Sequence, residues 1–378
     1  MKILLIGGSG IISTEVCRLA IEQGNDVYIL NRGKRKNFIH EKAHLVVADI
    51  RNENIECIKE KFFGLYFDVV VDFISFKVDE LKKSTSIFSD MCDQYIFISS
   101  ATVYEKQTAG GVISENTRLY NPDWNYANDK IVCEEFIQKL YASKKGKYYT
   151  IIRPYVTYGV TRIPFGVIPD HANYTLINRM IHNKPVVLWD GGEALCTLTY
   201  SKDFAVGVVG LFKNKKAYGE AFHIASPVSH RWKDVYNELC GILGVKDNHI
   251  SIPTDYIVKC MPRYKNNLLG DKARDMVFDT SKICDAVPEF TERTSLREGL
   301  LSVVEYYNGA TSAKDIDYKW DGQIDRMISN YTKSVGMKVN RKMLSSCAYG
   351  KISVKNHLQY LICRNKILFS IANMLMRK

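Results

Sequence analysis

Short apolar runs alternate with helical patterns along the first part of the chain. The runs that we expect to form strands are Lys2–Ile6, Asp26–Leu30, Leu45–Val47, Val69–Phe73, Tyr95–Ser99 and Tyr148–Arg153. Between the first two, apolar residues recur on one helical face over Ser13–Glu22, and Gly24 marks the helix end. The residues around Val70 and Ile96 are apolar on both sides, as in strands covered on both faces. The pattern therefore predicts an α/β fold built on a doubly wound parallel sheet.

A glycine-rich turn joins the first expected strand to the helix that follows it. Gly7 permits a tight turn, and Gly10 lets the backbone approach a pyrophosphate at the positive end of the helix. Ser13 is small enough for close helix–strand packing, and we expect Ile11 and Ile12 to lie at the same site. Glycines also serve packing in many such turns. The position directly after an N-terminal strand favours a dinucleotide site.

Polar residues after the next strands indicate which dinucleotide is bound. An acid after the second strand would hold the ribose hydroxyls, whereas an arginine suits a 2′-phosphate. The chain has Asn31 and Arg32 there, which favours NADP(H); the alternative is a solvated basic loop. Asp49, with Ile50 beside it, is placed to contact the adenine, although aspartate is also a common cap at a strand end. We expect Phe73, at the end of the fourth strand, to line the same site.

A tyrosine and a lysine lie one helical turn apart at Tyr126 and Lys130. A phenol with a pKa near ~10 is a poor base unless a cation stabilises its phenolate, and a lysine at i+4 lies on the same helix face. Ser99 and Ser100 end an expected strand, and Thr102 follows them. A lone pair of this spacing also occurs on solvated helix faces. With the hydroxyls and the glycine-rich turn, it favours proton transfer beside a nicotinamide.

In order and spacing, these motifs resemble the extended short-chain dehydrogenase/reductase group, the NAD-dependent epimerase/dehydratase family. The resemblance covers about residues 1–310 and rests on Gly7-x-x-Gly10-x-x-Ser13, Asp49, Ser99 to Tyr104, Tyr126-x-x-x-Lys130 and Arg153-Pro154. It implies a Rossmann-type fold, NAD(P) as cofactor and a nucleotide sugar as substrate. It also implies that Ser100 holds the substrate oxygen, that Tyr126 moves a proton, and that Lys130 binds the nicotinamide ribose. Pro154 would lie at the cofactor, and we expect a homodimer.

The residues after Ser100 bear on the type of reaction. Dehydratases of the resembled family carry an acid pair there, whereas this chain has Ala101 and Thr102, as 4-epimerases do. Dehydration is therefore disfavoured, and epimerisation or carbonyl reduction remains. Arg32 favours reduction, because an epimerase recycles its cofactor and usually keeps NAD.

The arginines that bind the substrate diphosphate in the resembled family are replaced here. Their positions read Leu195-Cys196-Thr197 and, before Gly270-Asp271, Leu268-Leu269. Bidentate arginine is the natural ligand of a diphosphate, so these changes bear on the substrate. The bases that could substitute are Arg162, Arg179, Lys272 and Arg274.

Charge is the one feature of the composition that changes this picture. Of the net +11, residues 340–378 supply eight positive charges and no negative one. Residues 1–339 therefore carry only +3, and nucleic acid is not an expected partner of the body.

The ten cysteines form no CxxC pair and no Cys/His cluster, and we expect no metal site. Met1 and Lys2 lead directly into a strand, without a basic leader or an apolar run of ~18 residues. We therefore expect a cytoplasmic protein.

Near the C-terminus, apolar residues recur at helical spacing between basic residues. They are Leu358, Leu361, Ile362, Leu368, Phe369, Ala372, Leu375 and Met376. One interpretation is a helix that contacts an anionic membrane surface through residues 355–378. The other is a helix packed on the body or on a dimer mate.

These observations predict three regions and two competing functions. The regions are a Rossmann-type NAD(P)-binding domain at 1–160 with returning segments from the later chain, a substrate-binding lobe at 161–310, and a C-terminal extension at 311–378. The leading hypothesis is an NAD(P)-dependent epimerase or reductase acting on a nucleotide-linked sugar. The alternative is a binding protein on a dehydrogenase scaffold that contacts RNA or a membrane through the basic tail.

Overall fold

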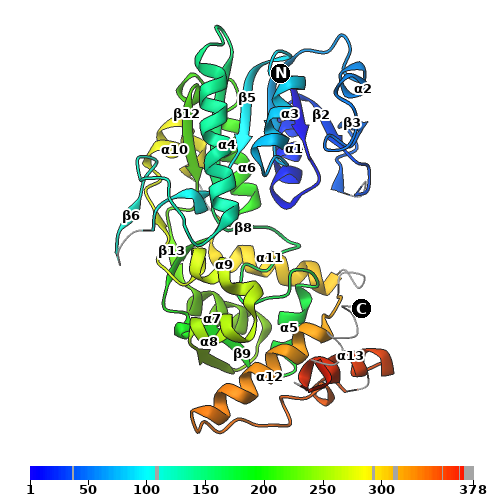
Figure 1. Cartoon of the computed structure of the whole chain (residues 1–378), viewed down its shortest axis with the longest axis vertical. Helices are drawn as coiled ribbons and strands as arrows, with labels where there is room; N and C mark the ends of the chain where they lie inside the picture. The colour runs from blue at the N-terminus through cyan, green and yellow to red at the C-terminus, as the bar shows by residue number, and fades with distance from the viewer. Residues whose placement is uncertain are drawn as a thin grey trace. The chain divides into compact units, whose positions relative to one another are not determined.

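The computed structural model describes residues 1–35, 38–106, 110–291, 294–309, 314–350, 352–365 and 367–369. The chain forms two compact units, whose elements are labelled in Figure 1. Unit 1 comprises residues 1–159, 196–229 and 275–294, and unit 2 comprises residues 160–195, 230–274 and 295–378. The region expected as a lobe at 161–310 is therefore interrupted twice by segments of unit 1. The expected extension at 311–378 belongs to unit 2.

Unit 1 is built on one sheet of seven parallel strands. In spatial order these are β12 (Glu220–Ile224), β7 (Tyr148–Pro154), β5 (Cys92–Ile98), β4 (Phe67–Asp72), β1 (Lys2–Ile6), β2 (Asp26–Asn31) and β3 (His44–Val47). The six strands expected from the sequence are all present, with ends that differ by at most three residues. β12 comes from the later chain and completes the sheet. The fold is thus the expected doubly wound, Rossmann-type parallel sheet.

Alternate residues of each strand fill two separate cores, one on each face of the sheet. Leu5, Val71 and Ile96 belong to the first core, where α1 (Ile11–Glu22), α6 (Ser201–Gly210) and α10 (Ser281–Ala286) pack. Leu4 and Val70 belong to the second, which α2 (Ile55–Glu60), α3 (Val78–Phe88) and α4 (Asn125–Ala142) cover. Burial on both faces explains why these strands are continuously apolar.

Short strand pairs complete unit 1. β8 (Thr157–Tyr158) pairs with β11 (Thr199–Tyr200), and β6 (Val112–Ile113) pairs with β15 (Val277–Phe278). β10 (Leu195–Thr197) and β13 (Ser229–Arg231) lie where the chain passes from one unit to the other.

Unit 2 is mainly helical. Its parallel pair of strands is β9 (Val186–Trp189) with β14 (His249–Ile252). Its helices are α5 (Tyr174–Ile181), α7 (Trp232–Leu243), α8 (Thr254–Cys260), α9 (Lys265–Asn267), α11 (Leu296–Gly309), α12 (Tyr318–Ser334) and α13 (Val354–Arg364). α12 and α13 pack side by side, orange and red in Figure 1. The helix expected over 358–376 begins earlier, at Val354, and ends at Arg364; residues 366 and 370–378 lie outside the described residues.

Candidate active site

The turn between β1 and α1 holds its shape through Gly7 and Ser13. Gly7 adopts a φ of +99°, and a Cβ there would overlap the side chain of Ile74. The Ser13 hydroxyl accepts a hydrogen bond from the Gly10 amide (2.9 Å) and donates to the Gly7 carbonyl (3.2 Å). A Cβ on Gly10 would meet only the Ser13 Oγ, at 3.4 Å. The space beside Gly10 is therefore open, as the close approach of a pyrophosphate to the helix N-terminus requires.

This turn forms one wall of a cavity of about 510 Å³ in unit 1. The expected cofactor residues that line it are Gly7, Gly10, Asn31, Arg32, Asp49 and Ile50. Lining residues that the sequence analysis missed are Ser9, Leu30, Lys34, Arg35, Ala48, Arg51, Ile74 and Phe76. The volume is in the range of small-molecule sites. Loops that follow β1, β2, β3 and β4 all contribute, so the cavity lies at the carboxyl edge of the parallel sheet.

Seven other residues expected at the cofactor do not line this cavity, and two of them, Tyr126 and Lys130, are described below. Ile11 and Ile12 form the first turn of α1, and Ile12 and Phe73 pack against the first core. Pro154 ends β7. Ser99 is buried, and its hydroxyl has no hydrogen-bond partner among the described residues. Their contact with a cofactor stays a prediction.

One side of the cavity is basic. Arg32, Lys34 and Arg35 line it and form no ion pair with any residue in the described part of the chain. The Asn31 side chain accepts a hydrogen bond from the Gly33 amide (2.7 Å), and its own NH₂ group is buried without a partner among the described residues. The Asn52 side chain foremost, with a smaller contribution from the charge of Arg32, holds the pKa of Asp49 below its usual value. A bound anion and a hydrogen-bond acceptor would satisfy these groups.

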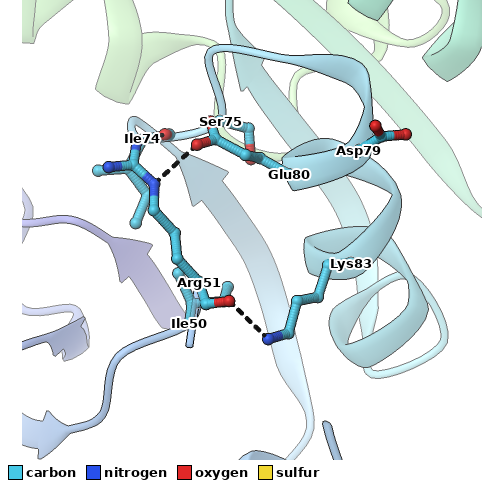
Figure 2. Close-up of a pocket in the computed structure, with 7 residues that line it drawn as sticks. All are labelled: Ile50, Arg51, Ile74, Ser75, Asp79, Glu80 and Lys83. Carbon is cyan, nitrogen blue, oxygen red and sulfur yellow. Dashed lines mark hydrogen bonds and ion pairs between the residues drawn. The ribbon is translucent and has the colours of Figure 1, made fainter. Parts of the chain in front are cut away.

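Arg51, with Ile50 and Ile74, also lines a smaller cavity of about 310 Å³, drawn in Figure 2. Its guanidinium pairs with Glu80 (2.8 Å) and donates to the carbonyl of Ile74 (3.0 Å). Lys83 donates to the backbone carbonyl of Arg51 (3.0 Å). These contacts tie the loop after β3 to the start of α3, so Arg51 forms a fixed wall shared by both cavities.

The hydroxyls expected to act in catalysis lie close together. The Ser100 and Thr102 oxygens are 2.9 Å apart, and the Thr102 amide donates to the Ser100 Oγ (3.3 Å). Tyr126, in the first turn of α4, lies close enough to Ser100 for the serine side chain to lower the pKa of its phenol. Burial raises the pKa of the Tyr126 phenol, and the Ser100 side chain offsets part of that rise. The phenol is therefore protonated at neutral pH.

Lys130 is almost completely buried, one turn after Tyr126 on α4. Its amine donates to the backbone carbonyls of Ser75 and Ile98, each at 2.7 Å, and lies 6.0 Å from the centre of the Tyr126 ring. Burial lowers the pKa of Lys130 to about 8, so the amine remains mostly a cation at pH 7. The sequence analysis expects this cation to stabilise a phenolate. In the structure the amine also ties the ends of β4 and β5 together beside the tyrosine, and its effect on a phenolate stays a prediction.

Two buried acids hold this arrangement, and the sequence analysis missed both. Asp72, fully buried at the end of β4, accepts hydrogen bonds from the Ser75 amide (3.0 Å) and hydroxyl (2.7 Å), which positions the carbonyl that Lys130 contacts. Glu134, one turn beyond Lys130, pairs with Arg153 of β7 (2.6 Å). In the sequence, the only indication of their structural role is their position: Asp72 ends a buried strand, and Glu134 lies on the buried side of a helix.

The bases suggested as diphosphate ligands differ in availability. Arg179 is fully buried in unit 2, where it pairs with Asp321 and Asp325 of α12, as does Lys184. Although burial raises it, the two cations hold the pKa of Asp321 below its usual value. Arg179 is therefore wrong as a ligand candidate.

Lys272 pairs with Asp271 (2.7 Å). Arg162 and Arg274 are exposed and form no ion pair with a described residue. These two arginines are the remaining candidates.

No group of three or more His, Cys, Asp or Glu side chains able to hold a metal occurs in the described part of the chain. Among the same residues, no helix is both long and apolar enough to cross a membrane.

The NAD dependent epimerase/dehydratase family model matches residues 3–225, which include the glycine-rich turn, Ser100, Tyr126 and Lys130, and the chain belongs to this family. A curated relative is the chloroplast stem-loop binding protein of 41 kDa b of Arabidopsis thaliana, 24% identical over 59% of this chain. The match spans only 58% of that relative's length. The 2′-dehydrokanamycin reductase of Streptomyces kanamyceticus is 22% identical over 78% of this chain and 81% of its own.

Among solved structures, the UDP-glucuronic acid 4-epimerase from Bacillus cereus in complex with NAD has a TM-score of 0.63 at 19% identity. The match covers 83% of this chain and 100% of that one. At this identity the similarity establishes the fold.

Proposed function

We propose that the chain is an NAD(P)-dependent reductase or epimerase that transfers hydride at an alcohol or carbonyl carbon of a nucleotide-linked sugar. The observation that carries the proposal is the grouping of Tyr126, Ser100 and the buried Lys130, in the same unit as the glycine-walled cavity. Similar proteins include a UDP-sugar epimerase with NAD and an aminoglycoside reductase, which supports a sugar substrate.

The cavity residues fit a dinucleotide. The glycine-rich turn would hold the pyrophosphate at the N-terminus of α1, and Asp49 with Ile50 would contact the adenine. Arg32, Lys34 and Arg35, with no acid after β2 to compete, would bind a 2′-phosphate, which favours NADP(H). The buried, unpartnered NH₂ of Asn31 would find an acceptor on the same ligand.

The protonated phenol of Tyr126 suits the reduction of a carbonyl. When bound, the cofactor supplies a hydride to the carbonyl carbon. The carbonyl oxygen takes the Tyr126 proton and becomes a hydroxyl, while Ser100 and Thr102 orient that oxygen. Lys130, protonated below a pKa of about 8, would stabilise the negative charge left on the phenolate. The reverse reaction would use the same groups with the proton moving to Tyr126.

The experiment that tests this proposal is a product assay on nucleotide sugars. Purified protein is incubated with UDP-, dTDP- and GDP-hexoses and their 4-keto derivatives, with NADPH, with NADH, or without added cofactor. We expect a keto sugar to be reduced with stoichiometric loss of NADPH absorbance. Interconversion of two hexose epimers without net cofactor consumption would identify the epimerase instead. No change in any sugar would contradict both forms of the proposal.

A further inference from the structure

Helix α13 turns its apolar side outward. Its inner side carries Tyr360 and Cys363, which are buried where the helix packs on α12. On the opposite side Val354, Leu358 and Leu361 are 76%, 52% and 38% exposed. At about 100° per residue, these three side chains lie within about 60° of one another and opposite Cys363. We call them the α13 outer face.

Apolar exposure continues beyond the end of the helix. Ile367 and Leu368 are 70% and 44% exposed. A contiguous group of exposed large apolar side chains on a protein surface indicates a binding surface, whereas single ones are ordinary. Of the hydrophobic stripe expected from the sequence, Leu358, Leu361 and Leu368 are therefore exposed and Ile362 and Phe369 are half-buried, whereas Ala372, Leu375 and Met376 lie outside the described residues.

The chain from α12 to the C-terminus carries a large excess of positive charge. From residue 318 to the C-terminus the sequence has twelve Lys or Arg residues and two acids, Asp321 and Asp325. Both acids are fully buried, where Arg179 and Lys184 pair with them. From residue 318 onward no exposed acid balances the surface cations; before it, Asp315 is exposed, and the charge of Asp317 at the start of α12 reaches Cys363 on the inner side of α13.

Two of these cations flank the outer face directly. On the helical wheel Lys355 and Arg364 lie about 90° to either side of its centre. Lys355 is exposed, and Arg364 is half-buried, with its Nε donating to the Leu344 carbonyl (3.4 Å). An apolar centre bordered by long basic side chains is the arrangement of a helix lying in a membrane interface.

We propose that the α13 outer face binds the surface of a membrane that contains anionic phospholipid. Leu358 and Leu361 enter the boundary between headgroups and acyl chains, and Lys355 and Arg364 contact lipid phosphates. The inner side stays packed on α12, so the helix binds without leaving unit 2.

A second copy of the chain fits this face less well. In a symmetric dimer the same patch meets itself, so Lys355 and Arg364 would approach their own copies. With no exposed acid from residue 318 onward, such an interface would place like charges together and leave them unpaired.

Co-flotation of the full-length protein with lipid vesicles tests the proposal. The vesicles contain phosphatidylcholine alone or with about 30% phosphatidylglycerol. We expect at least about tenfold more binding to the anionic vesicles at low salt, and a marked loss of that binding at high salt. Leu358→Asp with Leu361→Asp should abolish binding, and Lys355→Glu should weaken it. Val132→Asp, which changes an equally exposed apolar residue on α4, is the matched control and should bind like the wild type.

Three results would overturn the proposal. The first is absence of vesicle binding by the wild type, and the second is equal binding by the wild type and the double variant. The third is a dimer that the double variant converts to a monomer without any vesicle binding, which would make a second copy the occupant. Unchanged thermal unfolding of the variants excludes misfolding. Because vesicle binding needs no turnover, its failure would leave the proposed enzymatic function untouched.

Discussion

Replacing Tyr126 with phenylalanine is expected to reduce kcat by about 10²- to 10⁴-fold, the usual contribution of a positioned general acid. The substitution removes only the phenol oxygen and leaves the ring in contact with Phe76 and Trp124. Cofactor affinity should change little, because Tyr126 does not line the 510 Å³ cavity. The measurement pairs steady-state turnover on the substrate found by the product assay with the Kd of the cofactor.

Tyr120→Phe is the matched control for this experiment. Tyr120 is 44% exposed, in the same unit, and its ring stacks under Arg118. It should retain wild-type turnover. Full activity in Tyr126→Phe would show that the phenol moves no proton and would remove the central residue of the proposed mechanism.

Replacing Asp325 with alanine is expected to destabilise the protein by about 3–5 kcal/mol, the cost of breaking a buried ion pair. Asp325 contacts Arg179 (2.8 Å), Lys184 (2.7 Å) and the Tyr360 hydroxyl (2.5 Å), all fully or almost fully buried. Without it, two buried cations would share the single carboxylate of Asp321. The measurement is the free energy of unfolding in urea, with a fluorescence signal from unit 2 as the probe of unfolding.

Asp315→Ala removes an exposed acid from the segment before α12 and should change the unfolding free energy by less than about 0.5 kcal/mol. Tyr360→Phe keeps the charges and removes one hydrogen bond, so its effect should fall between the two. An Asp325→Ala variant as stable as Asp315→Ala would mean that the cluster does not hold α12 and α13 in unit 2.

Local patterns sufficed to predict the sheet and the glycine-rich turn. Continuous apolar runs mark strands buried on both faces, and Gly7 must adopt a positive φ that other residues rarely accept. The cavity residues nearest these strands, Asn31 to Arg32 and Asp49 to Ile50, follow from the same reasoning. The contribution of Arg51 and Phe76 to the cavity could not be predicted in this way, because nothing in a loop sequence shows how far a side chain reaches toward a neighbouring loop.

Long-range charge pairing could not be predicted. Asp321 and Asp325 lie four residues apart on a helix, a spacing that normally places acids on a solvated face. Their partners Arg179 and Lys184 come more than 130 residues earlier, so neither the burial of the acids nor the loss of Arg179 as a ligand could be inferred. Which side of α13 packs inward could not be predicted either, because periodicity identifies an apolar stripe but not the side of the helix that is buried.

Calorimetric titration of the protein with NAD, NADH, NADP and NADPH tests the central claim most directly, because it asks whether the cavity beside the glycine-rich turn binds a dinucleotide. We expect binding, with NADP(H) preferred, and we expect Arg32→Ala to lower NADPH affinity about 10- to 100-fold while leaving NADH affinity nearly unchanged. Lys42→Ala, an exposed base that does not line the cavity, should behave like the wild type. An NAD preference that Arg32→Ala does not alter would contradict the role of Arg32. No binding of any of the four nucleotides would contradict the account as a whole.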